Sequence, residues 1–199
     1  MHIKFKISSS ERDLELIYKL REEVFRKEDH YPEEALKTEY DKTATHFMAI
    51  KDGKLIGSLM IVLNSEKGLP IEKFLDISKL KDKPIAEVLK LAVLPEDRKT
   101  SVSMGLIVLA HEYAKGNGVK RICIVSLEKK QDNYKLYSRF GFKTIGKFNF
   151  YGIDNAYGMV LDLDEGFYET TGKKNKRKEL FAKKLAEKMS LLSKEELTE

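Results

Sequence analysis

The alternation of apolar and polar positions predicts a strand and then a helix at the start of the chain. In residues 2–7, Ile3, Phe5 and Ile7 alternate with polar neighbours, which is typical of a strand with one buried face. From Glu11 to Arg26 the apolar residues recur at helical spacing. We therefore expect this helix to lay one face on a sheet.

Two apolar runs further along the chain predict a hairpin of strands. They are His46–Ile50 and Leu55–Leu63, and the Asp-Gly pair between them is a strong hairpin signal. The polar segment Lys27–Thr45 before them is too long for an idle connection, so we expect it to cover part of the domain. Residues 64–84 after them are expected to form a loop with one short helix.

The stretch from Ala86 to Gly105 predicts a strand that runs through a turn into a helix. Val88–Val93 is mostly apolar and lies between Pro84 and Pro95, which suits a strand buried on both faces. Beyond the turn, apolar residues again recur at helical spacing up to Gly116. A helix N-terminus next to the carboxyl end of a strand presents unpaired N–H groups and a positive dipole end, so this turn predicts a phosphate site.

The rest of the chain completes one α/β (α+β) domain and adds a tail of different composition. Lys120–Leu127 predicts a strand parallel to the preceding one, Asp132–Arg139 a short helix, and residues 143–163 two more strands. We assign residues 1–165 to this domain. Residues 166–199 combine a basic block with apolar residues at helical spacing, which predicts a basic linker and an extra amphipathic C-terminal helix.

Composition narrows the class of protein. Hydrophobic residues make up 42% and charged residues 35% of the chain, and no apolar run is long enough to cross a bilayer. The N-terminus lacks the apolar stretch of a secretion signal, so we expect a cytoplasmic protein. Residues 172–199 hold nine Lys or Arg against five Glu, which accounts for +4 of the net charge of +5. The remaining body is close to neutral, which argues against nucleic-acid binding.

Cysteine and histidine usage predicts no metal site. The single cysteine, Cys123, lies in an apolar run, so we interpret it as a core residue rather than a nucleophile. The four histidines are scattered along the chain, and none has the clustered spacing of a zinc site.

The turn after the central strand resembles the R-x-x-G-x-G/A turn of GNAT acyl-CoA N-acyltransferases. Arg98 begins the turn, and Ser101 and Ser103 replace both glycines. Leu136–Phe142, LYSRFGF, resembles the second signature of this superfamily, L-Y-x-x-x-G-F. The resemblance covers about residues 80–147. It implies a GNAT-like fold, with a central mixed sheet flanked by helices, and a donor that is acyl-CoA or an acyl group on acyl carrier protein.

The resemblance also implies how the donor is bound. In this superfamily the central strand separates from its parallel neighbour and holds the donor with free backbone N–H groups. Amides near Leu91 and Val93 are then implied to bind the pantetheine arm and the thioester carbonyl, which stabilises the oxyanion of acyl transfer. The donor-binding residues implied in this way are Leu91, Val93, Arg98, Lys99, Ser101 and Ser103.

Two side chains are implied to carry the chemistry. Glu87 matches a glutamate that deprotonates the attacking amine in some members, and burial would raise its pKa toward neutrality. The alternative is an inward glutamate paired with a lysine such as Lys90. Tyr137 matches the tyrosine that donates a proton to the leaving thiolate, with a core aromatic residue as the alternative. The superfamily's asparagine seven residues before this tyrosine is Lys130 here.

The N-terminal half resembles the autoinducer synthases and their long-chain N-acyl amino acid synthase relatives. Arg21 and Phe25 fit the pattern R-x-x-x-F, and Asp41 ends a following E-x-D. The resemblance implies that these three residues shape a site for an amino-acid-like acceptor, with the guanidinium binding a carboxylate and the aspartate an ammonium. The alternative is a surface ion pair that ties the helix to the following loop.

The same pattern departs from the autoinducer synthases at two positions. It continues with E-x-x-R, which here is Glu87-x-x-Lys90, and Met60 stands where another arginine is expected after Gly57. These departures favour plain N-acylation of a small-molecule amine over lactone synthesis.

One functional alternative and several properties remain open. Ser101 and Ser103 favour a non-catalytic GNAT-like module that binds or senses a ligand, because side chains there can block backbone approach to pyrophosphate. Acyl chain length, the type of donor and the identity of the amine are not fixed by these patterns. The C-terminal helix is expected to pack on its own body or on a second copy in a homodimer. Its alternative partner is an acidic surface, either acyl carrier protein or an anionic membrane.

Overall fold

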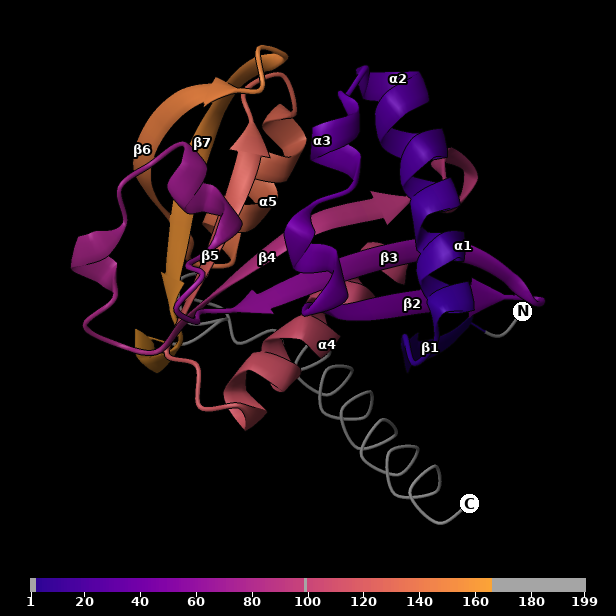
Figure 1. The fold of residues 1–199 in the computed structure, drawn as a ribbon, viewed down its shortest axis with the longest axis horizontal. Helices are drawn as coiled ribbons and strands as arrows, with labels where there is room; N and C mark the ends of the chain where they lie inside the picture. Colours follow the sequence, from indigo (N-terminus) through magenta and orange to yellow (C-terminus); the bar gives the residue numbers. More distant parts are fainter. Residues whose placement is uncertain (1–2, 99, 166–199) are drawn as a thin grey trace.

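The computed structural model describes residues 3–98 and 100–165 and forms one seven-stranded sheet. Its order is β1-β2-β3-β4-β5-β7-β6, and only the β4–β5 pair is parallel. The mixed sheet predicted from the sequence is confirmed (Figure 1). The strands are β1 (Ile3–Ile7), β2 (Thr45–Lys51), β3 (Lys54–Leu63), β4 (Ile85–Val93), β5 (Arg121–Leu127), β6 (Lys143–Phe150) and β7 (Asp154–Asp162). The predicted C-terminal helix and Lys99 lie outside the described residues.

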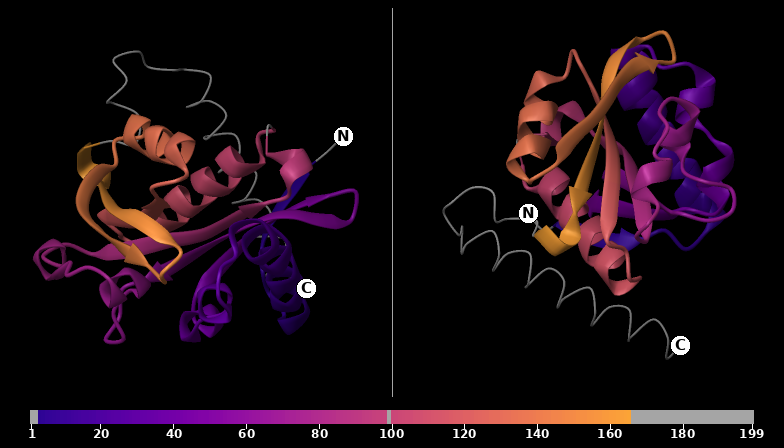
Figure 2. Two further views of the ribbon diagram at one scale, coloured as in Figure 1. Left: turned by 90° about the horizontal axis from the view of Figure 1, so that it is seen from above. Right: turned by 90° about the vertical axis from the view of Figure 1, so that its left-hand side faces the viewer.

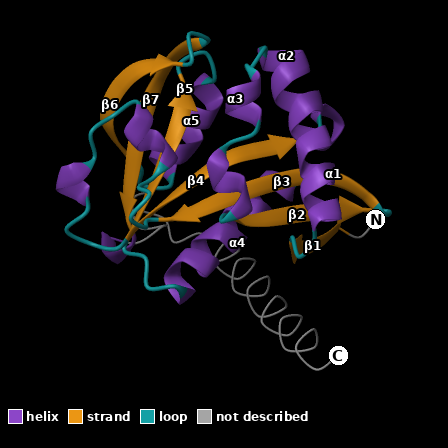
Figure 3. Cartoon of the chain, in the orientation of Figure 1, coloured by secondary structure: helices purple, strands orange, loops and turns teal. Residues whose placement is uncertain are grey.

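Helices cover both faces of the sheet (Figures 2 and 3). The first helical segment, α1 (Glu11–Arg21), begins at Ser10, whose Oγ accepts the Asp13 N–H, and continues through a π-helical turn into α2. It lies on one face together with α3, and α4 and α5 lie on the other face. The remaining bounds are Glu22–Arg26 for the π-helical turn, Lys27–Asp29 for α2, Glu33–Leu36 for α3, Val102–Gly116 for α4 and Gln131–Arg139 for α5.

The two long connections contain more structure than the sequence predicts. Residues 27–45 hold α2, α3 and a 3₁₀ turn, Glu39–Lys42, rather than a plain loop. Residues 64–84 hold two 3₁₀ turns, Pro70–Lys73 and Ser78–Leu80, instead of one short helix. Such short turns have little apolar periodicity, which is the signal that sequence analysis uses. In the described part of the chain, no helix has the length and apolarity needed to span a membrane.

The central strand β4 separates from β5 halfway along its length. Parallel pairing covers only Ile85–Glu87, and from Val88 to Val93 the strand pairs with β3 alone among the described residues. Figure 1 shows the two strands diverging toward their carboxyl ends. This divergence opens a slot and leaves one edge of the β4 backbone without a strand partner.

The middle of β4 is less buried than the sequence predicts. A strand buried on both faces was expected, but Val88–Leu91 are only half-buried because they border the slot. A bulge in the β3–β4 pairing lies at this place, and Lys90 within it has a left-handed φ of +55°. The bulge changes which face of the sheet the following side chains meet.

Candidate active site

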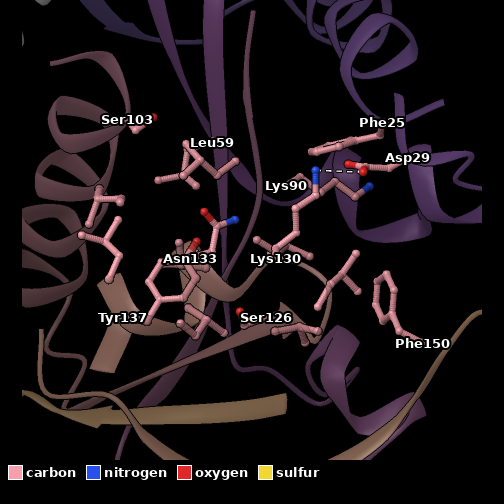
Figure 4. A pocket seen from close by; sticks show the side chains of 18 of the residues that line it. Phe25, Asp29, Leu59, Lys90, Ser103, Ser126, Lys130, Asn133, Tyr137 and Phe150 are labelled. Atoms are coloured by element: carbon pink, nitrogen blue, oxygen red, sulfur yellow. Dashed lines mark ion pairs between the residues drawn. The ribbon is translucent and has the colours of Figure 1, made fainter. Parts of the chain in front are cut away.

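A cavity of about 760 Å³ occupies the slot between β4 and β5. It is lined by the end of the first helix, by β4, by the turn before α4 and by the β5–α5 segment (Figure 4). Its lining is mainly apolar and includes an aromatic group in which Phe74 lies 5.2 Å from the Phe150 ring and Phe25 stacks on Tyr31 at 5.1 Å. The predicted site residues in the lining are Phe25, Glu87, Leu91, Val93, Arg98, Ser103 and Tyr137.

Glu87 is a buried carboxyl group on β4 at the point where the strands separate. Its side chain reaches the cavity, and its Oε2 accepts the backbone N–H of Ile71 at 2.7 Å. Burial raises the pKa of Glu87 to about 8, although the Ile71 hydrogen bond and the charge of Lys90 act in the opposite direction. The group can therefore change its protonation state in the neutral range, as a general base must.

The expected alternative partner of Glu87 is engaged elsewhere. Lys90 points toward α3, where its Nζ lies 3.0 Å from both Leu36 O and Asp41 Oδ2, and 3.5 Å from Thr38 Oγ1. An ion pair between Glu87 and Lys90 is therefore not formed, because the bulge directs the lysine to other acceptors. Burial and the charge of Arg21 lower the pKa of Lys90 to about 8, against the opposing effect of Asp41.

Arg21 and Asp41 form a buried ion pair behind the cavity lining. Arg21 Nη1 lies 2.5 Å from Asp41 Oδ1 and donates to Leu36 O at 3.1 Å, while Nη2 contacts His46 Nδ1 at 3.3 Å and Met60 Sδ at 3.5 Å. Both side chains are at most 1% exposed. The alternative expectation of a surface ion pair is therefore wrong, because the pair is buried.

The buried cluster around Asp41 holds two cations, Arg21 and Lys90, against one carboxylate. Burial alone would raise the pKa of Asp41, but the charges of Arg21 and Lys90 and the bonds from Thr38 hold it below its ordinary value. His46 donates Nε2–H to Asp41 O at 2.8 Å, so its Nδ1 is the acceptor facing Arg21. Burial keeps the pKa of His46 below its ordinary value. Asp41 thus forms ion pairs with both Arg21 and Lys90. Of these two cations, only Lys90 lines the cavity.

Tyr137 lies across the slot on α5. The ring packs edge-to-face on Phe142 at 5.9 Å and faces the cavity beside Asn133, one helical turn earlier (Figure 4). Burial raises the pKa of Tyr137 to about 12. The phenol is therefore protonated at neutral pH and has a proton to donate.

The turn between β4 and α4 brings together part of the predicted donor site. Arg98 Nε donates to Val93 O at 3.1 Å, and its Nη2 lies 2.7 and 2.6 Å from the two Glu28 carboxylate oxygens. Ser103 lines the cavity in the first turn of α4, whereas Ser101 is exposed outside the lining.

Sequence analysis missed two lining residues, Asp29 and Asn133, and the contact between Asp29 and Lys130. Asp29 and Lys130 form an ion pair at 2.8 Å, although they lie far apart in sequence and no local pattern links them. Asn133 could have been found, because it lies four residues before Tyr137 and therefore on the same helix face. Cys123 is a buried core residue as predicted, and burial raises its thiol pKa to about 12.

Comparison with known proteins relates the chain to one family and to several solved structures of the same fold. Residues 16–164 match the family described as N-acyl amino acid synthase FeeM. The structure of FeeM from uncultured soil microbes aligns with a TM-score of 0.72 at 19% identity, over 86% of this chain and 97% of that chain. Arabidopsis thaliana NAA60 in complex with acetyl-CoA aligns with a TM-score of 0.61 at 19% identity, over 82% and 99%. Escherichia coli ElaA aligns with a TM-score of 0.61 at 18% identity, over 81% and 100%. No curated protein matches the sequence.

Proposed function

The chain belongs to the N-acyl amino acid synthase FeeM family, within the GNAT superfamily, and from this premise we propose that it transfers an acyl group from a thioester to the amine of an amino acid. One observation carries the proposal. A carboxyl group that titrates near neutrality, Glu87, and a protonated phenol, Tyr137, face one cavity where β4 leaves β5. The family match favours catalysis over a non-catalytic ligand-binding module.

In the proposed reaction the side chains move protons and the β4 backbone stabilises charge. The neutral amine of the acceptor attacks the thioester carbonyl carbon, and ionised Glu87 takes the one proton that this nitrogen loses as the C–N bond forms. Unpaired backbone amides near Leu91 and Val93 stabilise the oxyanion. The C–S bond then breaks, the amide forms, and Tyr137 gives its proton to the thiolate.

Arg21 and Asp41 are proposed to affect acceptor binding without contacting the acceptor. Because both lie behind the lining, they position Lys90, which lines the cavity next to Leu89 and Leu91. Phe25 contributes a flat apolar surface to the same site. Of the three residues that the resemblance implied for the acceptor site, Phe25 is then available for direct contact, and Arg21 and Asp41 shape the site from behind the lining.

The lining favours a fatty acyl group over acetyl. Leu59, Val88, Leu89 and Ile124 border the cavity, and such an apolar surface gains free energy from each methylene that it removes from water. Coenzyme A and acyl carrier protein present the same pantetheine arm, so either can carry the donor. Arg98 and Lys99 are proposed to contact the phosphate of the donor. Lys99 is placed in this turn by the sequence resemblance alone. Acyl carrier protein docking, a homodimer, membrane contact by the tail and a cytoplasmic location stay predictions.

Acyl chain length is expected to change the rate strongly. Acyl-CoA donors from two to sixteen carbons are assayed for thiol release with a mixture of the twenty standard amino acids. Each added methylene contributes about 0.8 kcal/mol where it is buried, so kcat/KM is expected to rise several-fold per carbon until the cavity is filled. A rate that is highest with acetyl-CoA and falls steadily with length would contradict a fatty acyl donor.

Replacing Tyr137 with phenylalanine is expected to lower kcat about 100-fold, the lower end of the range for loss of a general acid. The ring packing on Phe142 is kept, so stability should change little. Tyr134→Phe is the matched control, because Tyr134 lies on the same helix but its hydroxyl contacts Thr144 outside the cavity. Equal steady-state rates for the wild type and Tyr137→Phe would remove the proton-donor role.

A further inference from the structure

An ion pair extends across the cavity between the two faces of the sheet. Lys130 Nζ, at the start of α5, lies 2.8 Å from Asp29 Oδ1 at the end of α2, and Lys129 Nζ lies 3.7 Å from the same oxygen. All three residues line the cavity. Figure 4 shows the Lys130 side chain reaching through the cavity to Asp29, next to Phe25. The lysine therefore stands in space that a substrate must share.

The cations of the lining differ in how fully they are engaged. Lys90 has an acceptor for each of its three N–H donors, in Leu36, Thr38 and Asp41. Arg98 belongs to the donor turn and binds Val93 O and both oxygens of Glu28. Lys90 is therefore engaged within the protein, and Arg98 lies in the turn that is proposed to bind the donor phosphate.

The ammonium group of Lys130 can donate further hydrogen bonds. Its ammonium has three N–H donors, and Asp29 is its sole ionic partner among the described residues. Asp29 is itself shared by two lysines, so the pair of ammonium groups exceeds the carboxylate by one charge. Asp132 also borders the cavity but has no ion pair with either lysine among the described residues.

A carboxylate of a ligand would give Lys129 and Lys130 a second anionic partner besides Asp29. Lys130 stands where the superfamily has a neutral asparagine, and the change introduces a mobile point charge on a long stem. Arg21, the cation that the sequence analysis assigned to an acceptor carboxylate, is buried behind the lining with four partners. The cation that can reach a ligand carboxylate in the cavity is therefore on α5 and not on α1.

We propose that Lys130, assisted by Lys129, binds the α-carboxylate of the amino-acid acceptor and so makes the enzyme prefer carboxylated amines over neutral ones. This inference rests on the proposed function. Asp29 holds the lysine over the cavity, and the acceptor carboxylate replaces or joins it as a partner of the ammonium group. Lys130 is then a specificity residue that contacts the substrate directly.

The first test compares amino acids with their amides in Lys130→Asn, the variant that carries the superfamily residue. The wild type and the variant are given a fatty acyl-CoA with an equimolar mixture of the twenty standard amino acids, or of their α-amides, and the N-acyl products are measured by mass spectrometry. Loss of a charge-assisted hydrogen bond is expected to lower the acid-to-amide ratio about 10- to 100-fold. Most of the change should appear in KM for the amino acids. Lys147→Asn is the matched control, since Lys147 pairs with Glu128 at 2.7 Å outside the lining.

A second test measures binding without turnover, by calorimetry with N-dodecanoylglycine and its primary amide. The wild type is expected to bind the acid at least 10-fold more tightly than the amide, and Lys130→Asn to bind the two about equally. Carboxylate preference in binding without any turnover would retain this inference and count against the proposed function. Equal binding of acid and amide by the wild type, or no binding of either, would overturn the inference. A Lys130→Asn variant that loses acyl-CoA affinity but keeps its acid-to-amide ratio would overturn it too.

Discussion

Replacing Glu87 with glutamine is expected to lower kcat about 1,000-fold, within the range for removal of a general base. Glutamine keeps the shape of the side chain and can still accept the Ile71 N–H, so the folded structure should be retained. Glu66→Gln is the matched control, because Glu66 is exposed and does not line the cavity. A steady-state rate within a few-fold of the wild type would rule out proton removal by Glu87.

The pH dependence of this variant identifies the titrating group. Because the pKa of Glu87 is raised to about 8, the carboxyl is mostly protonated at pH 6 to 7 and gains its basic form as pH rises. The wild-type rate should therefore increase with pH, reach half of its maximum near pH 8 and level off about one pH unit higher. This limb should disappear in Glu87→Gln. If the limb persists there, it belongs to Lys90, whose pKa is also about 8, or to the acceptor amine itself.

Replacing Asp41 with asparagine is expected to lower the free energy of unfolding by about 3–5 kcal/mol, the usual cost of removing one partner from a buried ion pair. The amide keeps the volume of the carboxylate but leaves Arg21 and Lys90 as two buried cations facing each other. Urea unfolding measures the change. Glu23→Gln, which removes the partner of Lys27 on the surface, should have little effect and serves as the control.

The stability contributed by Asp41 also has a defined pH window. Its pKa in the folded protein lies below the ordinary value, so its contribution is fully present above the unfolded pKa near 4 and is lost as pH falls through the folded pKa. The difference in unfolding free energy between the wild type and Asp41→Asn should therefore shrink on acidification. A constant difference, or a loss of less than about 1 kcal/mol at pH 7, would show that the pair does not stabilise the fold.

The sequence predicted the fold well where local periodicity is strong. The apolar runs at Leu55–Leu63 and Lys120–Leu127 are strands, and the recurrence after the central turn is α4, because buried faces impose a repeat that a single sequence displays. Glu87 and Tyr137 could be placed in one cavity only through the superfamily resemblance, since they lie on different elements and meet through the β4–β5 divergence.

The rest of the site depends on geometry that local sequence does not encode. The positive φ at Lys90 redirects its side chain to Asp41, so the spacing of Glu87 and Lys90 suggested a pair that does not form. The burial of Arg21 follows from α3 and β2 closing over it, which its own segment cannot reveal. Lys130 could be recognised as a departure from the superfamily, but its contact with Asp29 requires the folded chain.

The most direct test of the central claim is mass spectrometry of a reaction with a fatty acyl-CoA and ¹⁵N-labelled amino acids, with free thiol measured in parallel. The account predicts an N-acyl amino acid that contains the label, formed in equal amount to the released thiol and reduced about 1,000-fold in Glu87→Gln. Thiol release without the amide, or no reaction with any donor on coenzyme A or acyl carrier protein, would contradict it.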